Sequence, residues 1–184
     1  MLRRLFILIT CLLTCSLTVQ AATPEQFVKV ASEGKQICKL YRTVCTVRPV
    51  AHEKLWAITK PFGEIEISTG MIERLSEAQL RGVIYHEVGH RVLQHVEKTA
   101  EYIYISKYNK TFNQEVLNDF RRRNELQADK FAVYFSLFTL RNTDLKGALL
   151  IITPKQDMYI TGNTHPSTAD RIENIRRLYY GQIK

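Results

Sequence analysis

The sequence predicts an α+β domain that is mainly helical, with a small antiparallel sheet beside one long helix. Two patterns and the composition point to this fold class. Apolar residues recur every three or four positions over residues 76–97, 113–140 and 166–181, as in helices that bury one face. Over residues 43–70 apolar and polar residues alternate instead, as in strands. With 184 residues, 45% of them apolar, the chain can bury one sizeable core.

Residues 1–21 have the pattern of a secretory signal peptide. Arg3 and Arg4 precede an apolar run over residues 5–17, and Val19-Gln20-Ala21 offers small residues for cleavage after Ala21. The run is shorter than the roughly 20 residues that a membrane-spanning helix needs. We therefore expect an exported chain whose remaining part is soluble.

Export determines where the folded part is expected to act. A single domain of residues 22–184 would be periplasmic, unless the chain is a lipoprotein processed at Cys15, where Thr14 fits the processing signal poorly. Loss of the signal would lower the formal charge from +8 to +6, and such a basic protein can associate peripherally with anionic membranes. The basic residues are dispersed and lack interleaved aromatics, so we expect no nucleic-acid partner.

Cys38 and Cys45 are the two cysteines that would remain after cleavage. An isolated pair seven residues apart in an oxidising compartment predicts a disulfide that closes a small loop. A zinc knuckle is not expected from two cysteines alone.

The first helix is predicted from Thr23 towards Arg42. Thr23 and Gln26 form a capping-box pattern, and Pro24 suits the first helical position. This helix is expected to be scaffold.

A small sheet is predicted next. Residues 56–58 and 65–67 alternate on either side of the turn-forming sequence Lys60-Pro61-Phe62-Gly63, which predicts two short antiparallel strands. A third strand around residues 45–48 is an open possibility. Residues 71–75 are expected to form a helical turn that leads into the next helix.

The helix that follows carries the motif His86-Glu87-Val88-Gly89-His90. Ser76 and Gln79 form a second capping box at its start, and the helical pattern runs to Glu97 and on to about residue 107. Residues four apart lie one turn above each other, so His86 and His90 can direct their imidazoles at one metal ion. Glu87, rotated by about 100°, can take a proton from a water molecule held by that ion.

His95 follows on the same predicted helix. On a continuous helix it would point about 180° away from His86. We therefore predict a surface or helix-end histidine and not a third ligand.

The second long helix, predicted over residues 113–140, supplies a better third ligand. Glu125 and Asp129 are four residues apart and face the same way. One carboxylate can bind the metal while the other, Asp129, accepts the outer N–H of a ligating histidine.

The last part of the chain is predicted to be helical again. Residues 145–152 suggest a short helix within an irregular stretch, and Thr164-His165-Pro166 precedes a final helix that ends at Gly181. We find no internal repeat and no linker that would divide the domain.

Four sequence segments occur in the order seen in a known enzyme family. These are residues 64–70 (EIEISTG), HEVGH, residues 124–129 (NELQAD), and Thr164-His165-Pro166-Ser167 with Arg171. Together they resemble the gluzincin metallopeptidases of the HtpX, Oma and CAAX prenyl protease group, peptidase family M48. The resemblance covers most of the chain, from about Trp56 to Leu178.

The resemblance implies a zincin-like fold and a zinc-dependent endopeptidase. It implies one Zn²⁺ held by His86, His90 and Glu125, with Glu87 as general base. Asp129 would support a ligand, and His165 and Arg171 would lie beside the site. His165 is our candidate donor to the oxyanion, although a helix-capping or core role for it remains open.

The expected substrate is a polypeptide that lies extended along the outer strand near residues 56–59. Such binding is nearly independent of sequence and suits misfolded envelope proteins. A zinc-containing binding module or chaperone of the cell envelope that has lost turnover is the alternative, against which the intact Glu87 argues.

Overall fold

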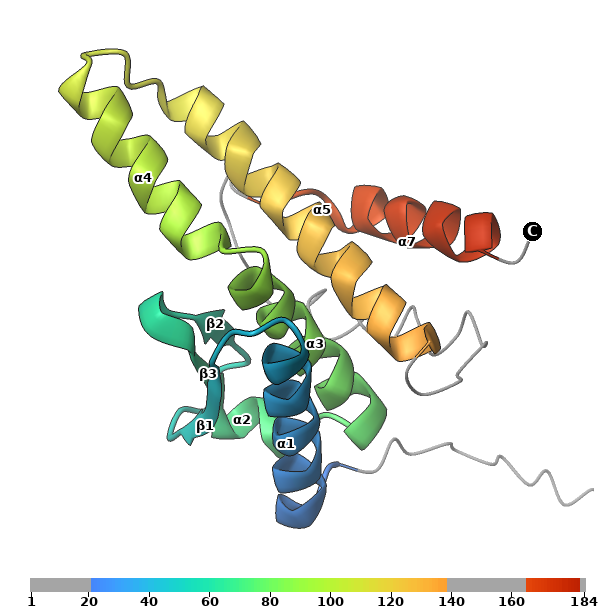
Figure 1. Ribbon diagram of the computed structural model, residues 1–184. Helices are drawn as coiled ribbons and strands as arrows, with labels where there is room; N and C mark the ends of the chain where they lie inside the picture. The colour runs from blue at the N-terminus through green and yellow to red at the C-terminus, as the bar shows by residue number, and fades with distance from the viewer. Residues whose placement is uncertain (1–20, 139–164, 183–184) are drawn as a thin grey trace, which may run out of the picture.

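The computed structural model describes residues 21–138 and 165–182, and shows a mainly helical domain with one small sheet (Figure 1). The elements are α1 (Pro24–Leu40), β1 (Thr46–Val50), β2 (Ala57–Thr59), a 3₁₀ turn (Pro61–Gly63), β3 (Glu64–Ser68), α2 (Thr69–Ile72), α3 (Glu77–Val92), α4 (His95–Tyr108), α5 (Gln114–Phe138) and α7 (Thr168–Gln182). This architecture confirms the predicted fold class.

The sheet has the strand order β1-β3-β2. The predicted antiparallel pair is present, with Ala57 opposite Ile67 and Thr59 opposite Ile65. The third strand also forms, but β1 runs parallel to β3, so the sheet is mixed and not wholly antiparallel. The reason is the strand order: β1 and β2 lie on opposite sides of β3, so β1 and β2 are not neighbours.

A tight turn joins β2 to β3. Phe62 and Gly63 both adopt left-handed backbone conformations, with φ of 64° and 87°. A Cβ atom on Gly63 would lie 2.1 Å from the carbonyl oxygen of Val44, so only glycine fits there.

The long helix predicted beyond residue 92 is in fact two helices. Leu93 caps α3, Gln94 is left-handed with φ of 58°, and α4 begins at His95. The left-handed conformation raises the energy of a non-glycine residue by about 1–2 kcal/mol relative to the right-handed one. The break packs Leu93 against the core and buries His95, which is only 3% exposed. No glycine or proline marks this break in the sequence.

Helix α3 lies at the centre of the fold and packs against α1 on one side and α5 on the other (Figure 1). Its start has the predicted capping box of Ser76 and Gln79, and α1 has that of Thr23 and Gln26. At Gly89 a Cβ atom would lie 3.1 Å from Cβ of Phe131 on α5. The missing side chain therefore lets α5 approach the motif-bearing part of α3.

A disulfide joins Cys38 and Cys45, as predicted, with their Cα atoms 6.1 Å apart. It ties the last turn of α1 to the residue before β1. The bond therefore anchors the sheet to the helical layer.

Helices α4 and α5 form an antiparallel pair that extends beyond the rest of the fold (Figure 1). Asn113 caps α5 by accepting hydrogen bonds from the backbone N–H groups of Glu115 and Val116. Ser167 caps α7 in the same way through Asp170 N–H. Helices α5 and α7 both lie where the sequence predicts them.

Two predicted segments, residues 1–20 of the signal peptide and the short helix at residues 145–152, lie outside the described residues. In the part of the chain that the structure describes, no helix combines the length and apolar character needed to cross a membrane.

Candidate metal centre

Three side chains from α3 and α5 converge on one point. His86 and His90 are one turn apart on α3, and their Nε2 atoms lie 3.0 Å apart. Glu125 of α5 faces both, with Oε2 lying 3.3 Å from His86 Nε2 and Oε1 lying 3.3 Å from His90 Nε2. Among the described residues, this is the group of histidine, cysteine and acidic side chains arranged to hold a metal ion.

The spacing of these atoms fits a small tetrahedral ion. Bonds of about 2.0–2.1 Å in a tetrahedron separate the ligand atoms by roughly 3.3 Å. Oε2 of Glu125 is also buried without a hydrogen-bond partner among the described residues. Burial alone would raise the pKa of Glu125, but the neighbouring His86 and His90 lower this pKa well below its usual value. The carboxylate is therefore charged and available as a ligand.

His86 is oriented by a buried ion pair. Its Nδ1 donates to Oδ1 of Asp129 over 2.8 Å, which leaves Nε2 directed at the converging ligands. Arg171 of α7 donates from Nε to Oδ2 of Asp129 over 2.6 Å and from Nη2 to Oδ1. Burial opposes the charge of Asp129, but the bonds from Arg171 and His86 hold the pKa of Asp129 below its usual value.

His90 is contacted on its outer side by His95, which lies at a helix end, as one of the two predicted alternatives, but is buried and not at the surface. The two Nδ1 atoms lie 3.0 Å apart, and His95 Nε2 lies 3.0 Å from Oε1 of Gln127 on α5. Burial, followed by the neighbouring His90, lowers the pKa of His95 to about 4. The predicted direction of the His95 side chain, away from the site, was wrong because it assumed a continuous helix, whereas the left-handed Gln94 turns His95 inward.

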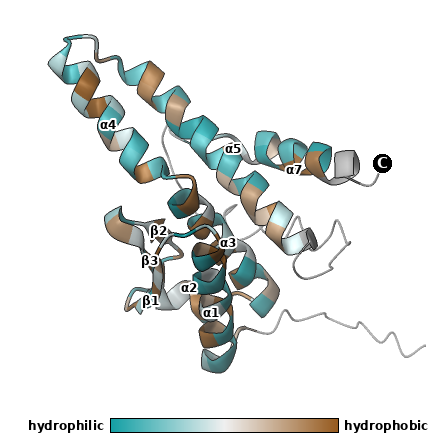
Figure 2. Ribbon diagram, in the orientation of Figure 1, coloured by the Kyte–Doolittle hydropathy of each residue, from teal (hydrophilic) through white to brown (hydrophobic). Residues whose placement is uncertain are grey.

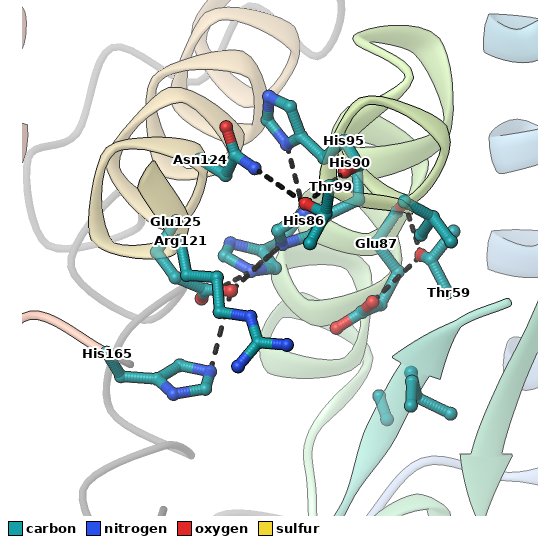
Figure 3. A pocket seen from close by; sticks show the side chains of 13 residues that line it. Thr59, His86, Glu87, His90, His95, Thr99, Arg121, Asn124, Glu125 and His165 are labelled. Carbon is teal, nitrogen blue, oxygen red and sulfur yellow. Dashed lines mark hydrogen bonds and ion pairs between the residues drawn. The ribbon is translucent and has the colours of Figure 1, made fainter. Parts of the chain in front are cut away.

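Glu87 lies beside this group, on the side of the sheet (Figure 3). The hydroxyl of Thr59 on β2 lies 2.9 Å from Glu87 Oε2 and 2.8 Å from the Glu87 backbone oxygen, and can donate to either. The end of β2 therefore holds a carboxylate that is only 4% exposed.

A cleft of about 500 Å³ opens over these residues. Its walls come from β2, α3, α4 and α5, together with His165. Nε2 of His165 lies 3.5 Å from Oε1 of Glu125. His165 is partly exposed, and Figure 3 shows its ring directed at Glu125. Arg171 does not line the cleft and lies beneath it against Asp129.

Sequence reasoning missed three polar residues of this site. The sequence predicts Thr59 only as part of a strand that binds substrate. The motif NELQAD includes Gln127 but predicts no role for it. Arg121 lines the cleft one turn before Glu125. The helical spacing of Arg121 and Glu125 could have identified the arginine as a residue of the site.

Comparison with known protein families yields two matches. Residues 80–182, more than half of the chain, match the family model Peptidase U49. The chain belongs to the peptidase U49 family. Residues 45–114 match the model of peptidase family M48, which spans β1 to the start of α5 and includes the HEVGH motif. No curated protein matches the chain.

Membership of the U49 family identifies the activity in outline. A U49 peptidase hydrolyses peptide bonds, so the substrates are polypeptides. In this member the converging His-His-Glu group is consistent with one metal ion, as a metallopeptidase requires.

Proposed function

We propose that the chain is a zinc-dependent endopeptidase in which His86, His90 and Glu125 bind one Zn²⁺. The observation that carries this proposal is their convergence, with ligand atoms within 4.8 Å of one another, at the floor of an open cleft. Two imidazoles and a carboxylate are a ligand set typical of catalytic zinc, which keeps a fourth position for water or substrate.

Zinc held by His86, His90 and Glu125 would supply a water molecule of lowered pKa and would polarise the scissile carbonyl. Glu87 takes a proton from the attacking water and later delivers it to the leaving amine. The contact with Thr59 supports this role because it restricts the Glu87 carboxylate to one orientation.

His165 is the proposed donor to the oxyanion of the tetrahedral state. Its place on the cleft wall, 3.5 Å from Glu125 Oε1, supports this role because a donor there faces the reacting carbonyl. Asp129 and Arg171 act further out, by holding His86 in the tautomer whose Nε2 lone pair can bind metal.

The substrate is proposed to bind as an extended strand along β2. Within the described residues β2 pairs only with β3, so its other edge can form main-chain hydrogen bonds with a peptide. Ala57, Ile58 and Thr59 line the cleft, which places that edge beside Glu87. Recognition through the backbone suits unfolded polypeptides of varied sequence.

The proposed setting is the periplasm, where residues 22–184 would form one domain after removal of the signal and degrade misfolded envelope proteins. The Cys38–Cys45 disulfide supports an oxidising compartment. Cell fractionation with mass analysis of the N-terminus tests this: a mature chain beginning at Ala22 is expected. A chain that begins at a lipid-modified Cys15 would instead support the lipoprotein alternative.

Peripheral membrane association is proposed for the far end of the α4–α5 pair. Tyr104 and Tyr108 are 72% and 80% exposed there, and Lys107 and Lys110 are near them in the sequence. Figure 2 shows hydrophobic positions along α4 although this helix projects from the fold. Tyrosine and lysine suit an anionic lipid surface. Sedimentation with anionic but not neutral vesicles is expected, and equal sedimentation with both would contradict it.

The activity is tested by measuring zinc content and casein cleavage of the purified protein. We expect one zinc per chain, cleavage of casein, loss of cleavage with a chelator and recovery on adding zinc. A zinc-loaded protein that never cleaves casein but suppresses aggregation of unfolded proteins would favour the alternative, a silent binding module or chaperone. A protein free of metal would overturn both.

A further inference from the structure

The two histidines of the metal group have different partners on their outer sides. His86 has a carboxylate partner, which is the usual arrangement for a metal-binding histidine. His90 instead has the imidazole of His95, which in turn contacts the side-chain amide of Gln127. His95 does not belong to the metal group itself. A role for it must therefore act through His90.

The positions of the protons along this chain of contacts follow from hydrogen-bonding capacity. Oε1 of Gln127 can only accept, so the proton of a neutral His95 lies on Nε2. His95 Nδ1 then carries a lone pair, and the 3.0 Å contact must use a proton on His90 Nδ1. That arrangement leaves the lone pair of His90 on Nε2, the atom that faces His86 and Glu125.

The opposite arrangement would block the metal group. If Gln127 presented its NH₂ group, His95 Nε2 would accept and His95 Nδ1 would donate to His90. The proton of His90 would then lie on Nε2, between the ligands. The orientation that the structure shows for Gln127 is therefore the one compatible with metal binding.

The backbone delivers His95 to this position at a conformational cost. A continuous helix would turn His95 away from His90, but the left-handed Gln94 redirects the chain so that His95 begins α4 with its side chain 3% exposed. Thr99 anchors the same turn by donating to the His95 carbonyl over 2.6 Å. The break between α3 and α4 therefore has a specific consequence for the site.

We propose that His95, supported by Gln127, is a positioning residue that fixes the tautomer and ring orientation of His90 for metal binding. This inference rests on the proposed zinc site. It assigns to α4 a part in the site that the HEVGH motif does not include. The general expectation for losing such an outer partner is a fall in metal affinity of about 10–100-fold.

The test uses two substitutions at one position and a matched control. His95→Phe keeps a ring but removes the acceptor, whereas His95→Asn keeps an oxygen acceptor near the place of Nδ1. His52→Phe, in the exposed loop before β2, controls for loss of a histidine elsewhere. Zinc affinity is measured by competition with a chelator, and the His90 tautomer by ¹⁵N NMR of the imidazoles in the metal-free protein.

We expect His95→Phe to weaken zinc binding by about 10–100-fold and to abolish the preference for the Nδ1–H tautomer of His90. His95→Asn should recover most of the affinity, and His52→Phe should match the wild type. Wild-type affinity and tautomer in His95→Phe would overturn the inference while leaving the zinc site intact. A loss in His95→Asn as large as in His95→Phe would also overturn it.

A second position keeps the inference testable if His95→Phe does not fold. Gln127 is exposed apart from its contact with His95, so Gln127→Leu should fold, and we expect a smaller loss of affinity in the same direction. An unchanged affinity and tautomer in Gln127→Leu would then overturn the inference. A wild-type protein without any zinc affinity would instead refute the proposed function from which it starts.

Discussion

The two sides of the metal group are supported by opposite kinds of chemistry. On the side of α5 and α7, His86 depends on the ion pair of Asp129 and Arg171, whose side chains are 0% and 6% exposed. On the side of α4, His90 depends on neutral groups, the imidazole of His95 and the amide of Gln127 at the surface.

This difference separates folding from metal binding. A buried ion pair repays its desolvation only while complete, and removing one partner leaves an unpaired buried charge that costs about 3–5 kcal/mol. A neutral hydrogen bond contributes about 0.5–1.5 kcal/mol. Substitutions on the α7 side are therefore expected to lower both stability and metal affinity, whereas those on the α4 side should mainly lower metal affinity.

The largest effect on metal binding is expected where both sides meet, at Glu125. Glu125→Ala removes a ligand that faces both histidines, so zinc affinity should fall by more than the roughly 10–100-fold typical of an outer partner. Chelator competition measures it, with Glu115→Ala on the same helix as the exposed control. Wild-type affinity in Glu125→Ala would refute the three-ligand site.

Asp129→Ala should show the double effect of the charged side. It leaves the Arg171 charge unpaired, so stability should fall by about 3–5 kcal/mol, and zinc affinity by about 10–100-fold. Urea unfolding of the metal-free protein and chelator competition measure the two effects. If Asp129→Ala lost no more stability than Asp119→Ala, an exposed aspartate on the same helix, the contrast between the two sides would fail.

Thr59→Val tests a contact that belongs to neither side. The hydroxyl holds Glu87 and not a metal ligand, so turnover should fall by roughly tenfold, the value of one hydrogen bond, at unchanged zinc affinity. Steady-state cleavage of a peptide measures it against Thr46→Val on β1, which is exposed. A loss of zinc in Thr59→Val would show that β2 supports the metal as well.

The smallest effect on the site is expected from the disulfide. Replacing Cys38 and Cys45 by serine should lower stability by about 2–3 kcal/mol, as expected for so short a loop, and leave zinc affinity unchanged. Unfolding and chelator competition separate the two quantities. A marked loss of zinc affinity would connect the α1–β1 junction to the site.

Local patterns predicted the parts of the fold that local interactions determine. The capping pairs Thr23–Gln26 and Ser76–Gln79 mark where two helices begin, and the alternation over residues 56–67 marks the antiparallel strands. The direction of β1 depends on how the chain passes β3, which no local pattern records.

The same limit applies to the site. Spacing on helices predicted that His86, His90 and Glu125 could converge, and the structure brings them together. Spacing could not predict the contact of His95 with His90, because Gln94 adopts a left-handed conformation and no glycine or proline marks the helix break. The pairing of His95 with Gln127 spans 32 residues and exists only once α4 folds back on α5.

The central claim is that the metal ligands and the general base are separate groups, and Glu87→Gln tests it most directly. The substitution keeps the shape of the side chain and removes its ability to accept a proton. We predict that the variant folds, binds one zinc per chain as the wild type does, and loses nearly all casein cleavage. A metal-free variant, or one that cleaves casein at the wild-type rate, would contradict the account.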